Sequence, residues 1–178
     1  MHELLKSIII AIVTLPVGAL LAALARYLKN RNTSISGKWV DVAYEMDTGR
    51  ELYYAVFDIK ILNDVMKING EVFNTQHQFE WLFNSEICQQ EDCKLKLLSM
   101  DSENKDGTLK RVYWEFSFSE NKGLLSSPTS FNGYYMSGDK KRTVRGLKLT
   151  KKMRKQLKKK QDSESILKLL IPTIKNQT

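Results

Sequence analysis

Cysteine and histidine are scarce in this chain, which limits the chemistry that it can perform. Only Cys88, Cys93, His2 and His77 occur among 178 residues, too few and too dispersed for a four-ligand structural zinc site. The sequence also lacks a phosphate-binding glycine loop, the zinc-protease pattern H-E-x-x-H and the nucleophile elbow G-x-S-x-G. We therefore expect no enzyme, metal or cofactor. Two reduced thiols are expected, and a disulfide is the alternative if the chain is exported.

Basic residues are concentrated at the two ends of the chain, so the middle has almost no net charge. Of the overall +8, residues 1–36 carry +3, residues 37–149 carry −2 and residues 150–178 carry +7. A nucleic-acid-binding domain is expected to be basic throughout, so DNA and RNA are not expected partners. Basic segments beside a nearly neutral domain suit the surface of an anionic membrane. The same boundaries predict an anchor with linker, a folded sensing domain and a basic tail.

Residues 7–25 contain no charge, and their sequence SIIIAIVTLPVGALLAALA predicts one transmembrane helix. A helix of this length rises about 28 Å, which just crosses the hydrocarbon core of a bilayer. Small residues at helical spacing form a narrow face that suits close helix packing. The members of this face are Gly18, Ala19, Ala22 and Ala23. The alternative is that glycine and alanine are simply common in membrane segments.

Basic residues flank the apolar segment unequally, which predicts its orientation. Lys6 stands alone before it, whereas four basic residues follow, Arg26, Lys29, Arg31 and Lys38. The more basic side faces the cytosol, so we expect a single-pass protein with a cytosolic C-terminal domain. A cleaved signal peptide is the competing interpretation, because Ala23-Leu24-Ala25 fits the small-x-small cleavage pattern. The basic residues directly after that site oppose export.

The middle segment reads as an all-β domain. Short runs rich in β-branched and aromatic residues alternate with polar or glycine-containing turns, and no helix-length apolar periodicity intervenes. We expect about eight strands in a small up-and-down β-barrel, and an open two-sheet sandwich is the main alternative. The expected strands are residues 38–46, 52–62, 65–73, 79–83, 94–100, 108–118, 131–136 and 142–149. Gly37 and Trp39 resemble the G-x-W that opens lipocalin-like barrels, where an indole plugs one end.

Tyrosine, tryptophan and arginine are frequent around these strands and suggest a ligand site. Aromatic rings can stack on bases and arginines can pair with phosphates, so the combination suits a nucleotide. The candidate binding residues are Tyr44, Tyr54, Arg111, Tyr113, Trp114, Tyr135, Arg142 and Arg145. The alternatives are core packing for the aromatics and a solvated edge for the arginines. The carboxylates Asp41, Glu45 and Asp58 are the candidates for acid–base chemistry. They are equally compatible with outward, solvated positions on their strands.

The tail is expected to be a short basic helix or a disordered segment. Residues 151–160, KKMRKQLKKK, are either solvated or docked on anionic lipid headgroups near the anchor. Residues 165–174, SILKLLIPTI, are apolar enough to contact a membrane or the barrel and too short to span a bilayer.

The order of these features resembles a known family. An N-terminal membrane segment, the opening GKWVDVAYE (37–45) and the closing FNGYYMSGDKKRTVRGLKL (131–149) look like the bacterial CBASS antiphage effectors that fuse transmembrane helices to a minimal β-barrel. The resemblance implies that the barrel binds a cyclic dinucleotide made during phage infection. It further implies that the protein oligomerises in the inner membrane and disrupts it. Members often have two transmembrane helices, whereas this chain has one such segment.

We accordingly expect a receptor-effector of the bacterial inner membrane, with a cyclic dinucleotide, membrane lipids and further copies of itself as partners. Two other classes remain open. A lipocalin-like carrier, anchored or exported, requires an aliphatic barrel interior without inward arginines. A membrane adaptor for another protein requires a solidly packed interior and an outer contact surface.

Overall fold

The computed structural model describes residues 18–19, 21–22, 35–62, 65–91, 94–102, 110–119, 127–157 and 162–176. The chain divides into two compact units, and the larger one comprises residues 35–120 and 128–178. The smaller unit includes residues 18–19 and 21–22, which have helical backbone. The larger unit contains the barrel.

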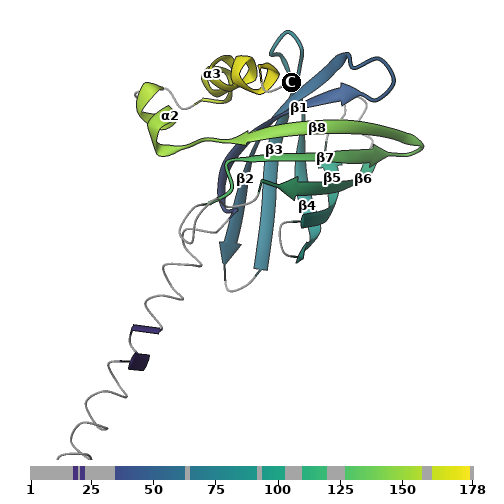
Figure 1. Cartoon of the computed structure of the whole chain (residues 1–178). Helices are drawn as coiled ribbons and strands as arrows, with labels where there is room; N and C mark the ends of the chain where they lie inside the picture. Colours follow the sequence, from purple (N-terminus) through teal and green to yellow (C-terminus); the bar gives the residue numbers. More distant parts are fainter. Residues whose placement is uncertain are drawn as a thin grey trace, which may run out of the picture. The chain divides into compact units, whose positions relative to one another are not determined.

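Eight antiparallel strands form a closed barrel in simple sequence order (Figure 1). Each strand pairs with its neighbour in the chain, and β1 pairs with β8 to close the sheet. The strands are β1 (Gly37–Glu45), β2 (Glu51–Leu62), β3 (Val65–Asn74), β4 (Phe79–Glu91), β5 (Lys94–Ser102), β6 (Lys110–Phe118), β7 (Ser130–Ser137) and β8 (Lys140–Lys148). The expected up-and-down barrel is thus confirmed, and the two-sheet sandwich is excluded.

Strand β4 departs most from the sequence prediction. It was expected to end at Phe83, but it continues to Glu91. The pairing of β4 with β5 shifts between Ser85 and Ile87, so the inward and outward positions exchange there. A bulge of this kind breaks the period-2 pattern on which the prediction relied.

Trp39 closes one end of the barrel. Its indole is completely buried, donates from Nε1 to the Ile35 carbonyl at 2.8 Å, and contacts the rings of Phe118 and Phe131 at 5.2 and 5.5 Å. The Lys148 ammonium lies 5.5 Å from the indole centroid, within cation–π range. The G-x-W segment therefore plugs this end, as its resemblance to lipocalin-like barrels implied.

Large aromatic side chains fill the middle of the barrel, and glycines paired with them on the neighbouring strands make room for their rings. A Cβ at Gly146 would lie 2.2 Å from the ring of Phe131, and one at Gly70 would lie 2.4 Å from Phe83. Phe57 and Phe116 stack on each other, with centroids 6.0 Å apart. The interior is consequently packed from the Trp39 end to its middle.

Helix α3 (Ser163–Lys175) covers the outer face of the barrel beside β1, β2 and β8 (Figure 1). Its apolar side buries Ile166, Leu167, Leu170, Ile171 and Ile174 against outward residues of these strands. Asp162 caps its start by accepting from the Ser165 N–H at 2.8 Å. At its end, Lys175 Nζ lies 2.7 Å from a Glu51 carboxylate oxygen. The apolar part of the tail therefore packs on the barrel.

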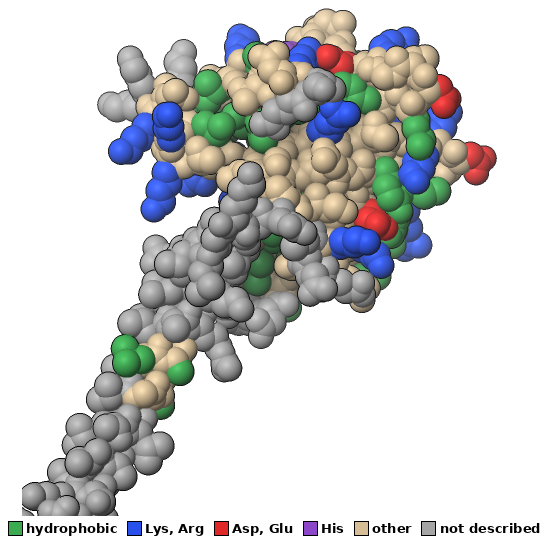
Figure 2. Space-filling model, viewed as in Figure 1, with side chains coloured by type: hydrophobic (Ala, Val, Ile, Leu, Met, Phe, Trp, Pro, Cys, Tyr) green, Lys and Arg blue, Asp and Glu red, His purple; other side chains and the backbone are tan. Residues whose placement is uncertain are grey.

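Helix α2 (Lys151–Gln156) is short and exposes basic side chains, which Figure 2 shows projecting from it. Arg154 lies next to Gly37, because a Cβ built there would be 4.0 Å from its guanidinium. Burial, together with the charge of Arg154, lowers the pKa of Lys148. The basic helix thus lies at the end of the barrel where β1 begins.

No helix among the described residues is both long and apolar enough to cross a membrane. Most of the predicted span 7–25 lies outside those residues, as does Ala23 of the small-residue face. Gly18, Ala19 and Ala22 lie within the described part and have helical backbone.

Replacing Leu170 by alanine should lower the free energy of unfolding by about 2–5 kcal/mol, because it deletes a fully buried side chain between α3 and the barrel. Lys168→Ala, on the exposed side of the same helix, is the matched control and should cost at most about 0.5 kcal/mol. Urea unfolding followed by circular dichroism measures both. Equal effects would show that α3 is not part of the folded barrel.

Candidate ligand-binding site at the open end of the barrel

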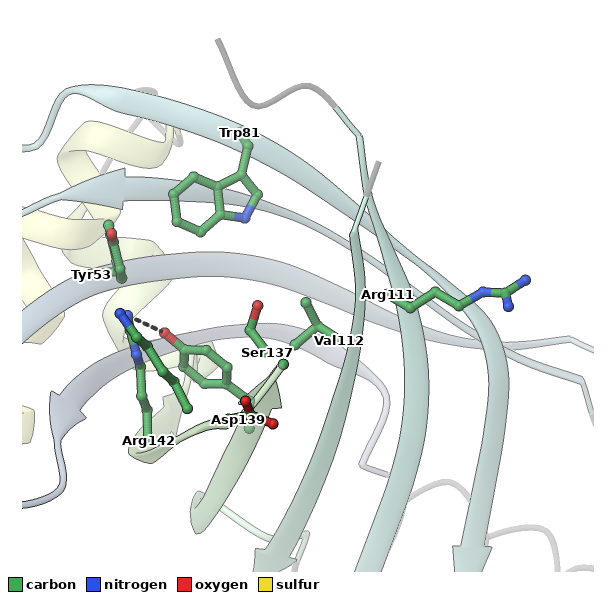
Figure 3. Close-up of a pocket in the computed structure, with 10 residues that line it drawn as sticks. Tyr53, Trp81, Arg111, Val112, Ser137, Asp139 and Arg142 are labelled. Carbon is green, nitrogen blue, oxygen red and sulfur yellow. Dashed lines mark hydrogen bonds between the residues drawn. The ribbon is translucent and has the colours of Figure 1, made fainter. Parts of the chain in front are cut away.

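A pocket of about 620 Å³ opens at the end of the barrel opposite Trp39 (Figure 3). Inner side chains of β2, β4, β7 and β8 and the turn between β7 and β8 form much of its wall. The lining residues are Tyr53, Trp81, Arg111, Val112, Tyr135, Ser137, Gly138, Asp139, Lys140 and Arg142. This volume suits a ligand of nucleotide size.

Aromatic rings form the deeper walls of this pocket. Tyr53 and Trp81 meet edge to face with centroids 4.8 Å apart, and Trp114 lies 4.6 Å from Tyr135. Ala43 and Ala55 occupy inward positions on β1 and β2 where other levels of the barrel carry larger residues. Small side chains on two neighbouring strands thus leave space between the rings. Such flat, rigid walls favour a planar ligand.

Arg142 supplies positive charge to the pocket. Its Nη1 donates to the Tyr135 hydroxyl at 3.3 Å, drawn as the dashed line in Figure 3, and its guanidinium lies 5.7 Å from the Tyr53 ring. Burial raises the pKa of Tyr135 to about 12 although the Arg142 charge opposes the rise, so this hydroxyl keeps its proton. Within the described part of the chain, Arg142 forms no ion pair with a carboxylate. Its charge is therefore available to an anionic group.

Asp41 lies below the aromatic walls and is only 2% exposed. Burial raises the pKa of its carboxyl group to about 8, and a hydrogen bond from the Ala55 backbone partly opposes the rise. Among the described residues, two buried side-chain atoms have no hydrogen-bond partner, Asp41 Oδ2 and Trp81 Nε1. Both residues line a second, smaller cavity of about 20 Å³ beneath the pocket, together with Tyr53, Trp114 and Tyr135. This cavity is called the floor below.

The structure brings some of the sequence-predicted residues together and separates others. Arg111, Tyr135 and Arg142 line the pocket and Trp114 lines the floor, although Figure 3 shows the Arg111 side chain pointing away from the other labelled residues. Tyr54 belongs to the lining of the floor, but it packs on the outer face under α3 and donates from its hydroxyl to Glu51 at 2.7 Å. Three further candidates, Tyr44, Tyr113 and Arg145, also have outward positions on their strands. Arg145 lies over the Tyr44 ring, with its guanidinium carbon 5.8 Å from the ring centroid.

The predicted binding residues did not include Asp41, Tyr53 or Trp81, which line the floor. The alternating pattern of β2 could have identified Tyr53. Alternate residues of a strand point to the same side, and Tyr53 alternates with the inward residues Ala55 and Phe57. Asp41 shares its parity with Trp39 in the same way. The sequence left Asp41 equally compatible with an outward position, and the structure places it inside.

No protein-family model matches the chain, and a search of curated proteins gives no match either. Within the described residues, no group of three His, Cys, Asp or Glu side chains is arranged to hold a metal ion. Cys88 is a free, half-buried thiol, and burial raises its pKa; Cys93 lies outside the described residues. Function must therefore be inferred from the pocket and the sequence.

The raised pKa of Asp41 makes the stability of the barrel depend on pH. Above about pH 4 the unfolded chain releases this proton, whereas the folded chain keeps it until about pH 8. The unfolding free energy should fall as pH rises through this window, by at most about 1.4 kcal/mol per pH unit. Asp41→Asn should remove this slope, so that the variant melts higher than the wild type at pH 8.

Asp139→Asn changes an exposed aspartate in the turn between β7 and β8 and serves as the matched control. It should keep the wild-type dependence on pH. The measurement is the melting temperature of each variant from pH 5 to pH 9. If Asp41→Asn kept the wild-type dependence on pH, Asp41 would not be its source.

Proposed function

We propose that this chain is a membrane-anchored receptor-effector of antiphage defence, whose cytosolic barrel binds a cyclic dinucleotide. Binding then drives clustering of the N-terminal helices and disruption of the bacterial inner membrane. Because a ligand shifts an assembly equilibrium only by its differential affinity, the ligand must bind the assembled form more tightly than the single chain. No chemical step is required.

The observation that carries the sensing part is the composition of the pocket. Aromatic rings, among them Tyr53, Trp81 and Tyr135, can hold a base by stacking. Arg142 and Lys140 at the same opening can pair with phosphate oxygens. A cyclic dinucleotide presents these two chemistries in one compact ligand.

The membrane part rests on the uncharged sequence 7–25 and on the position of α2. Nine residues, 26–34, separate the apolar segment from Ile35, and this length reaches at most about 32 Å when fully extended. The end of the barrel where β1 begins must then stay near the bilayer. The basic residues of α2 lie at that end, where anionic headgroups attract them by about 1 kcal/mol each. The pocket opens at the other end of the barrel, away from these basic residues.

The two alternative classes fit the barrel less well. A carrier of apolar molecules needs an aliphatic interior, yet Arg142 lines the pocket and Asp41 lines the floor. An adaptor needs a solidly packed interior, which holds for the Trp39 end and the middle but not for the open end. We therefore favour a receptor for a small polar ligand.

A ligand at 100 times its dissociation constant should raise the melting temperature of the full chain in detergent by about 5–10 °C. The test is a panel of cyclic dinucleotides. Arg142→Ala should weaken binding of the active compound at least tenfold, because it removes a charge-assisted contact. The matched control is Arg145→Ala, three residues along the same strand and on the outer face, which should bind like the wild type. No shift with any cyclic dinucleotide would refute the receptor function.

Replacing Ala22 and Ala23 together by leucine should prevent close helix contact while keeping the segment apolar. We expect an unchanged melting shift with the cyclic dinucleotide and a loss of ligand-dependent dye release from vesicles that contain the full chain. Leu20→Ile and Leu21→Ile together form a control of similar volume. Undiminished dye release by the leucine variant would exclude these residues from helix packing.

A further inference from the structure

The two buried polar atoms without a partner belong to the same small cavity. Trp81 Nε1 can donate a hydrogen bond, and Asp41 Oδ2 can accept one once the carboxyl group has released the proton that its raised pKa of about 8 retains in the empty barrel. Leaving a buried polar atom unsatisfied costs about 1–3 kcal/mol. A ligand that satisfies both atoms regains this free energy on binding, so the floor is built to favour such a ligand.

We infer that the floor recognises the edge of a nitrogen heterocycle, with Asp41 Oδ2 accepting from an amino or ring N–H and Trp81 Nε1 donating to a neighbouring ring nitrogen or carbonyl. This inference rests on the proposed function in that it assigns the base-recognising part of the same site. The class of ligand is a flat heterocycle with a donor beside an acceptor on one edge.

The dimensions of the site agree with this assignment. The floor, at about 20 Å³, holds a single small polar group such as an amino group. The ring that carries this group lies above it, in the pocket of about 620 Å³. There it meets Tyr53 on one side and Tyr135 on the other. An anionic substituent at the far side of the ring reaches the opening, where Arg142 lies.

Asp41→Asn tests the acceptor directly because the Ala55 backbone fixes the orientation of the side chain. The Ala55 N–H bonds to the carboxyl group, and Oδ2 has no partner. In the asparagine variant the carbonyl oxygen takes the bond from Ala55, so the amide NH₂ points into the floor. Above pH 8 the wild-type carboxyl group is ionised and accepts, whereas in the variant a donor faces the donor of the ligand, so binding should weaken by at least tenfold.

The three tryptophans of the chain provide a readout that is specific to the floor. Trp39 Nε1 donates to the Ile35 carbonyl at 2.8 Å, and Trp114 Nε1 donates to Ser99 Oγ at 2.8 Å. Trp81 Nε1 has no partner. A ligand in the floor should therefore shift the Trp81 indole N–H signal most in a ¹⁵N-resolved NMR spectrum and leave that of Trp39 unmoved, since Trp114 also lines the floor. Trp81→Phe identifies the Trp81 signal by its disappearance.

The experiment compares 2-aminopyrimidine with 2-methylpyrimidine, added at pH 8.5, where Asp41 is ionised, to the ¹⁵N-labelled full chain in detergent micelles. The two probes have the same ring and differ only in the 2-substituent, which is an amino donor in one and a methyl group in the other. We expect 2-aminopyrimidine to shift the Trp81 signal and 2-methylpyrimidine to bind at least tenfold more weakly. Asp41→Asn should abolish this preference, and its unmoved Trp39 signal would show that the barrel is intact.

Equal affinity of the two probes for the wild type would overturn the inference, as would a preference that survives in Asp41→Asn. The probes carry no phosphate, so the result is separate from the proposed function. If the floor prefers 2-aminopyrimidine while no cyclic dinucleotide raises the melting temperature, base recognition stands and the receptor function fails. If a cyclic dinucleotide binds while the probes are not distinguished, the receptor function stands and the floor assignment fails.

Discussion

The pairing of β1 with β8 is the constraint on which the rest of the structure depends. It joins the first and last strands of the sheet, so every strand has two neighbours and each inward side chain faces a closed interior. Asp41 lies on β1 and Arg142 on β8, so closure brings residues that are distant in sequence to the floor and the pocket of one site. Without closure, the carboxyl group would be solvated and the floor would not exist.

Within the closed sheet, the size of the inward residues decides where a ligand fits. Trp39, Phe131 and Phe57 fill one end and the middle, and glycines next to them make room for the rings. Alanines and aspartate on β1 and β2 leave the other end open. Packing is therefore dense at the Trp39 end and in the middle of the barrel. It is incomplete at the other end, where polar atoms line the floor. A barrel of this size gives up little of its core for one binding site.

The sequence predicted the topology well because alternation and turns are local signals. Gly49 and Gly138, in the turns after β1 and β7, adopt the positive φ angles that their turns require. Individual site residues were harder to predict, because an aromatic residue suits the inside and the outside of a strand equally. Tyr53 and Tyr54 are neighbours, and only strand parity separates a pocket residue from one that packs under α3. The bulge in β4 changed that parity at a place where no glycine or proline marked it. Trp81 lies beside another irregularity, where the pairing of β3 with β4 shifts between Val72 and Phe73.

Helix α3 supports the pocket although it lies on the outside of the barrel. Val40, Val42 and Tyr54 contact the helix, and the residues that alternate with them along β1 and β2 are Asp41, Ala43 and Tyr53 of the site. The outer face of β1 and β2 thus packs against the helix, and the inner face of the same two strands lines the floor. At the two ends of the helix, Lys175 forms an ion pair with Glu51 of β2, and Ser163 donates a hydrogen bond to Glu71 of β3. The C-terminal segment acts as an external brace of the binding site. A chain shortened before residue 163 would lose the stiffness of its pocket together with the cover of its apolar surface.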